Sequence, residues 1–153
     1  MRMAVENAIV QRENPKIATR ILDNGTKIKM YFGNIVIPAT LNDSDTAKAL
    51  IKMLPYTISL SNYGNDFCGV MEHPLLYNEE DVHNGWLNGD IDFATDGNWF
   101  TILFGGEGTS GGYGYQVNIG KIDCELEKIS RLRGSQQVRI KLAEVSEEAE
   151  GQT

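Results

Sequence analysis

The sequence has few residues of the kinds that mark a metalloprotein, a disulfide-rich secreted protein or a membrane protein. Its 153 residues include two histidines and two cysteines, Cys68 and Cys124, which lie far apart and form no CxxC unit. Separated cysteines of this kind are typical of free thiols and not of a disulfide framework or a zinc site. No apolar run approaches the roughly 20 residues that a bilayer-spanning helix needs. We therefore expect no metal, no cofactor and no membrane association.

Basic residues are also scarce. Lysine and arginine together number 14 against 21 acids, which gives a formal net charge of −7. Nucleic-acid binding usually needs a sustained basic stripe, and the sequence shows none, so we expect no nucleic-acid partner. Glu6 stands where a signal peptide would carry its apolar core. The sequence predicts a cytoplasmic protein that is a monomer or a weak homodimer.

Composition favours one globular domain with short appendages. Hydrophobic residues make up 41% of the chain and charged residues 23%, close to ordinary globular usage. Residues 27–142 carry the periodic patterns of a folded unit. Residues 1–26 form an N-terminal extension with candidate strands at 8–12 and 17–22. Residues 143–153 are acidic and have little apolar surface to bury, so we expect a disordered tail.

Short apolar segments joined by glycine-rich turns dominate the folded unit. Asp96-Gly97 and Gly33-Asn34 are steps that supply the positive φ of tight hairpin turns. The expected hairpin strands are 27–32 with 35–39 and 90–94 with 98–104, and further strands are expected at 57–60, 115–119 and 137–142. The pattern predicts a mainly β protein with antiparallel pairing.

Two segments have helical periodicity. Ala47, Leu50, Ile51 and Leu54 follow an Asn-Asp-Ser capping sequence at 42–44, and Pro55 ends this helix. A second short helix is expected at 124–132, capped by Asp123 and stopped by Gly134. Residues 61–88 show no clear pattern and are expected to be irregular, with Trp86 anchoring them. We expect the loop at about 64–88 and the glycine-rich loop 105–114 to flank one cleft.

Three motifs could be functional but also have ordinary structural explanations. Gly106, Gly108 and Gly111 fit the spacing of a dinucleotide fingerprint, but the residues after them alternate like a strand, which excludes the required helix. His73 and His83 are more typical of loop histidines than of metal ligands. Asp90 and Asp92 share one strand face and are the candidate pair for acid–base catalysis, although such pairs are more often solvated surface.

Aromatic residues suggest a binding cleft. Period-two alternation puts Phe100 and Phe104 on one strand face and Trp99 on the other. The aromatic residues predicted to line the cleft are Phe67, Phe100, Phe104, Tyr113 and Tyr115. No residue has the setting of an activated nucleophile, so we predict no catalytic residue from these patterns.

Several segments resemble the bacterial cyclophilin-like family of small β-barrel proteins. The most specific are TAKALIKMLPYTISLSNYG at 46–64, Gly89-Asp90, Ile-Leu-Phe-Gly at 102–105 and Gly-Lys-Ile-Asp at 120–123. The resemblance spans about residues 27–142. It implies an eight-stranded antiparallel barrel with a short helix over each end.

The resemblance also bears on activity, because true cyclophilins are prolyl isomerases. Gly69 occupies the place of their catalytic arginine, and Gln116 the place of their pocket histidine. The resemblance therefore adds Gln116 to the predicted cleft and implies a module that binds a small molecule or an extended peptide without prolyl isomerase activity. The alternative is a weak prolyl isomerase, or an acid–base enzyme that uses Asp90 and Asp92 in the same cleft.

Overall fold

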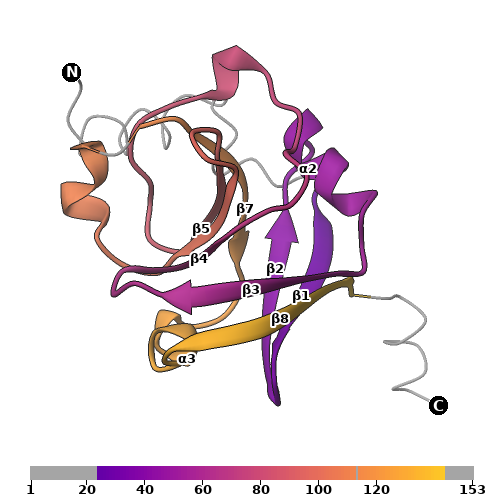
Figure 1. The fold of residues 1–153 in the computed structure, drawn as a ribbon, viewed down its shortest axis with the longest axis vertical. Helices are drawn as coiled ribbons and strands as arrows, with labels where there is room; N and C mark the ends of the chain where they lie inside the picture. Colours follow the sequence, from indigo (N-terminus) through magenta and orange to yellow (C-terminus); the bar gives the residue numbers. More distant parts are fainter. Residues whose placement is uncertain (1–23, 113, 144–153) are drawn as a thin grey trace.

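The computed structural model describes residues 24–112 and 114–143, and these residues form a closed antiparallel β-barrel (Figure 1). The strands are β1 (Thr26–Phe32), β2 (Ile35–Leu41), β3 (Tyr56–Asn62), β4 (Asp66–Val70), β5 (Asp90–Ala94), β6 (Trp99–Leu103), β7 (Gln116–Ile122) and β8 (Ser135–Leu142). Their order around the barrel is β1-β2-β7-β5-β6-β4-β3-β8. The predicted eight-stranded architecture is confirmed. The candidate strands at 8–12 and 17–22 and the acidic residues 144–153 lie outside the described residues.

Both predicted hairpins are present, because their turn residues adopt the backbone that tight turns need. Gly33 has φ of 61° at the β1–β2 turn, where Phe32 pairs with Ile35. In the β5–β6 turn, Gly97 has φ of 108° and Asn98 has φ of 62°. Glycine reaches these angles without the clash that a Cβ causes.

The barrel interior is a continuous apolar core. Alternate residues of each strand point inward. Within this core, three phenylalanine rings contact one another in a row. The Phe67 ring lies 5.2 Å from Phe32 at 69° and 6.1 Å from Phe104 at 56°, measured between centroids. Such tilted contacts are the favoured geometry for aromatic pairs. Phe67 and Phe100 are completely buried, or nearly so.

Two α-helices in the described chain lie at opposite ends of the barrel (Figure 1). Helix α2 (Asp45–Ile51) joins the end of β2 to the start of β3, and α3 (Leu126–Ser130) joins the end of β7 to the start of β8. The predicted Ser cap of α2 is confirmed, since the Ser44 hydroxyl accepts a hydrogen bond from the Ala47 N–H at 3.1 Å. No helix among the described residues is long and apolar enough to cross a membrane.

The prediction that Asp123 caps the second helix is wrong. The N-cap of α3 is Glu125, and the Asp123 carboxylate instead accepts a 2.6 Å hydrogen bond from the Thr40 hydroxyl. Lys27 and Lys121 each lie 3.5 Å from the same carboxylate. These partners come from β1, β2 and β7, so only the barrel brings them to Asp123.

The prediction that residues 61–88 are irregular is wrong for strand β4. Asp66–Val70 pairs along its whole length with β6, from Asp66 opposite Leu103 to Val70 opposite Trp99. The five residues contain one large apolar inward side chain, Phe67, so the alternation that marks a strand is too short to detect. Pairing with β6 supplies the order that local sequence does not.

Gly69 allows the close approach of β4 to β3. A Cβ at this position would overlap the carbonyl oxygen of Ser59 and would lie 3.1 Å from the Leu60 side chain. Gly120 in β7 has the same relation to the carbonyl oxygen of Thr40 in β2. Both glycines are required by close backbone contact, and neither has a positive φ.

We therefore predict that Gly69→Ala destabilises the protein strongly, because the β3 backbone has to move to admit the methyl group. The expected loss is about 3 kcal/mol of unfolding free energy or more, measured by urea denaturation. Gly108→Ala is the matched control, because its added Cβ meets no atom within 4 Å. Equal stability of the two variants would contradict the close contact.

Candidate functional site

The outer faces of β4, β6, β5 and β7 form one surface, on which side chains lie in rows across the strands. The pairing registers place Cys68, Thr101, Asp92 and Asn118 in one row across the four strands. The neighbouring row consists of Val70, Trp99, Ala94 and Gln116. Because side chains alternate along each strand, these residues point away from the phenylalanine core. Most of them are nevertheless buried, so this outer face is covered.

A cleft of about 330 Å³ opens on this surface. The described residues that line it are Tyr63, Asn65, Asp66, Cys68, Trp86, Ala94, Trp99, Thr101, Leu103 and Gln116. Thr101, Leu103 and Gln116 are buried, whereas Tyr63 is 63% exposed. We call this the outer-face cleft. It contains both tryptophans of the sequence.

The two loops that were expected to flank a cleft lie against each other. The Trp86 N–H donates to the Ser110 hydroxyl at 3.0 Å, and the indole Nε1–H donates to the Gly105 carbonyl at 2.8 Å. Asn88 and Glu107 exchange two further hydrogen bonds, at 3.0 and 3.1 Å. Trp86 is 6% exposed, which confirms that it anchors the long loop. The loop therefore forms a wall of the outer-face cleft through Trp86.

Gln116 is held at the edge of the cleft by a short backbone bridge. The N–H of His83 donates to the Gln116 carbonyl, and the N–H of Gln116 donates to the His83 carbonyl, both at 2.8 Å. The Gln116 side chain is 7% exposed, and its Oε1 accepts no hydrogen bond from any described residue. A buried acceptor without a donor is energetically costly.

Asp90 and Asp92 are fully buried, which corrects the interpretation of this pair as solvated surface. Every residue of strand β5 is buried, so both faces of the strand are covered. Asp90 Oδ2 accepts a hydrogen bond from the Leu87 N–H at 2.9 Å, and Asp92 Oδ1 accepts one from Asn118 Nδ2 at 3.0 Å. Neither carboxylate is among the described lining residues of the cleft. Their contacts support the chain around the cleft.

The Asp92 contact continues into a buried amide chain. Asn42 Nδ2 donates to Asn118 Oδ1 at 3.1 Å, and Asn42 Oδ1 accepts from the Ser44 N–H at 3.1 Å. The chain thus connects the outer face of β5 to the capping residue of α2. Buried polar groups that find partners in this way fix the relative position of the elements that carry them.

Asp66 and Cys68 form a coupled pair on the outer face of β4. Burial, the charge of Asp66 and a hydrogen bond to its carboxylate together raise the pKa of the Cys68 thiol to about 12, and burial is the largest of these causes. Burial also raises the pKa of Asp66, although the hydrogen bond from Cys68 opposes the rise. The thiol is therefore protonated at neutral pH and donates to the carboxylate.

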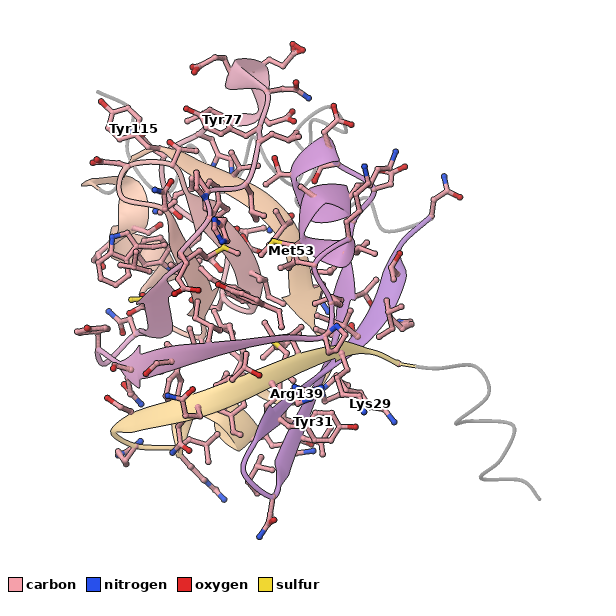
Figure 2. The ribbon with its side chains drawn as sticks, turned by 45° about the vertical axis from the view of Figure 1, so that its right-hand side comes forward. Lys29, Tyr31, Met53, Tyr77, Tyr115 and Arg139 are labelled. Atoms are coloured by element: carbon pink, nitrogen blue, oxygen red, sulfur yellow. The ribbon has the colours of Figure 1, made fainter. Side chains whose placement is uncertain are left out.

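Of the five predicted cleft residues that the structure describes, one lies at the outer-face cleft. Gln116 lines it, whereas Phe67, Phe100 and Phe104 point into the barrel core. Tyr115 is 59% exposed and projects at the same margin of the molecule as Tyr77 (Figure 2). Tyr113 lies outside the described residues.

Sequence reasoning missed the outer-facing residues of the same strands. The signal was the alternation itself, which already separated Trp99 from Phe100 and Phe104. Phenylalanine is the commoner core residue of a small barrel, so the tryptophan face was the better candidate for a cleft. Asp66 and Cys68 carried no signal, because β4 was not recognised and its pairing with β6 was unknown.

The position matched to the catalytic arginine of cyclophilins does not face the cleft. Gly69 shares its strand face with Phe67, and both are buried toward the core. A side chain at residue 69 would meet the Ser59 carbonyl and the Leu60 side chain. An arginine introduced there is expected to disrupt the barrel and not to restore a catalytic donor.

The described residues show no group of three or more His, Cys, Asp or Glu side chains arranged to hold a metal ion. The fold and the site thus define a small closed barrel with a ligand-sized cleft on its outer face. The chain belongs to the cyclophilin-like family, which it matches over residues 30–141.

The fold is similar to the solution structure of a hypothetical protein from Archaeoglobus fulgidus. The two share 15% sequence identity and a TM-score of 0.65, with 78% of this chain and 95% of the other chain covered. At this identity the likeness shows a shared fold. No curated protein matches the sequence.

We predict that Cys68 in the folded protein reacts slowly with iodoacetamide at pH 8. A thiol reacts as its thiolate, and a pKa of about 12 leaves a thiolate fraction on the order of 10⁻⁴ at that pH. Labelling of Cys68, followed by peptide mass spectrometry, should be at least about tenfold slower than in the urea-unfolded chain. Asp66→Asn removes two causes of the raised pKa and should accelerate labelling. Equal rates in the folded and unfolded chains would contradict this assignment.

Proposed function

We propose that this protein is a binding module whose outer-face cleft holds a small molecule or an extended peptide segment, without prolyl isomerase activity. The observation that carries the proposal is a cleft of about 330 Å³ in which two tryptophan side chains lie near the buried polar side chains of Thr101 and Gln116. Ligand sites typically combine apolar walls with a few such orienting polar groups.

The size and composition of the cleft support binding. Its volume of about 330 Å³ is within the range of small-molecule sites, which span roughly 300–1,000 Å³. Trp86 and Trp99 supply large rigid apolar surfaces, and Thr101 and Gln116 supply polar atoms on buried side chains. Hydrogen bonds to Gly105 and Ser110 hold Trp86 in place, so the wall that it forms is preorganised.

The expected lack of isomerase activity has a physical basis. Isomerisation is accelerated by a strong donor that weakens amide resonance at the prolyl nitrogen. No lysine, arginine or histidine is among the described lining residues, and the indole Nε1–H of Trp86 is already bonded to Gly105. The arginine position of cyclophilins is held by Gly69, which faces the core.

Binding is tested by intrinsic fluorescence, because both tryptophans of the chain line the cleft. We expect members of a library of small aromatic compounds and short peptides to change the emission with saturable titration curves. Gln116→Leu should weaken the ligands found by about tenfold, since it removes the amide at similar volume. Gln137→Leu, on the exposed outer face of β8, is the matched control. A library without a single saturable ligand would contradict the proposal.

Isomerase activity is tested by a protease-coupled assay on a short proline peptide, with a true cyclophilin as positive control. We expect the rate to equal the uncatalysed background, because one missing donor alone costs a factor of roughly 10²–10³. A rate well above background that falls in Gln116→Leu and not in Gln137→Leu would show that the cleft is catalytic.

A further inference from the structure

The outer-face cleft combines a single carboxylate with aromatic walls. Among the described lining residues, Asp66 is the one carboxylate, and no lysine, arginine or histidine accompanies it. Tyr63, Trp86 and Trp99 supply the aromatic rings. Aromatic faces carry a negative quadrupole, so rings beside a carboxylate favour a positive charge between them.

The hydrogen-bonding groups of the cleft also favour a cationic ligand. Three of its donors are used within the protein: Trp86 Nε1–H by Gly105, the Thr101 hydroxyl by the Asp92 carbonyl at 3.0 Å, and the Cys68 thiol by Asp66. A lone pair remains on the Thr101 hydroxyl, and the Asp66 carboxylate can accept further hydrogen bonds. A ligand rich in donors fits this set of acceptors.

The distribution of charge around the barrel reinforces this preference. Lys29, Arg139 and Lys141 gather on the outer face of β1 and β8, where Figure 2 shows Lys29 and Arg139 beside Tyr31. In the strand order this face lies across the barrel from β5 and β6. The chain as a whole carries a formal charge of −7. These three basic residues therefore lie away from the β5 and β6 side of the barrel.

The surroundings of Asp66 disfavour its ionised form. Its pKa is raised by burial, and the described protein offers it one neutral partner, the Cys68 thiol, as the opposing influence. A cation within about 4–6 Å would stabilise the ionised carboxylate.

We propose that the outer-face cleft binds an organic cation, an ammonium or guanidinium group on an apolar stem, with Asp66 as its counter-ion. This inference rests on the proposed binding function and adds the charge class of the ligand. The stem packs against Trp86 and Trp99, and the cationic head lies between Asp66 and the Thr101 hydroxyl.

The test compares three probes that share a phenyl ring and differ in charge: benzylamine, benzyl alcohol and benzoate. Each is titrated into the full chain while tryptophan emission is recorded. We expect benzylamine to bind about tenfold more tightly than benzyl alcohol, and benzoate more weakly than either. A capped Ala-Lys-Ala peptide and its Ala-Gln-Ala counterpart distinguish a cation carried by a peptide from a free amine.

Asp66→Asn should remove the advantage of benzylamine and leave benzyl alcohol unchanged. Asp43→Asn, an exposed acid before α2, changes the net charge equally and should have no effect. The comparison within the wild-type protein needs no variant, so it decides the question even if Asp66→Asn fails to fold. Equal binding of amine and alcohol, or tighter binding of benzoate, overturns the cation inference and leaves the binding module standing. If no probe and no library member binds, both proposals are overturned.

Discussion

Strand β4 can join the barrel because Gly69 has no side chain. Its backbone lies against the Ser59 carbonyl of β3, and Gly120 of β7 lies in the same way against the Thr40 carbonyl of β2. These two contacts flank the four strands that carry the cleft. The positions of Asp66, Cys68 and Gln116 therefore depend on a backbone approach that no other residue type permits at 69 and 120.

The strands of this region are buried on both faces, which separates two kinds of chemistry within one short sequence. The inward face is apolar and contains the contacting rings of Phe32, Phe67 and Phe104. The outward face contains buried polar groups whose contacts run from Asp92 through Asn118 to Asn42. An apolar interior stabilises the barrel, and the polar outer layer fixes the loops and α2 against it.

The cleft has few of the groups expected of a site for proline isomerisation. Trp86 Nε1–H and the Thr101 hydroxyl are engaged with protein acceptors, and among the described lining residues Asp66 is the one charged side chain. Under the proposed binding function, this composition favours a positively charged ligand. Members of a shared fold commonly differ in this way, because function depends on a few side chains placed on a common scaffold.

The sequence by itself determined the hairpins, the Ser44 cap and the mainly β class, because turns and caps depend on residues within a few positions of one another. It also contained the separation of Trp99 from Phe100 and Phe104, although not the choice of which face was the core. Tertiary structure alone decided that Asp66–Val70 is a strand, that Asp90 and Asp92 are buried, and that Trp86 lies beside Gln116. These features depend on pairing between segments about 20 or more residues apart, which local patterns do not encode, and the closure of the barrel sets that pairing.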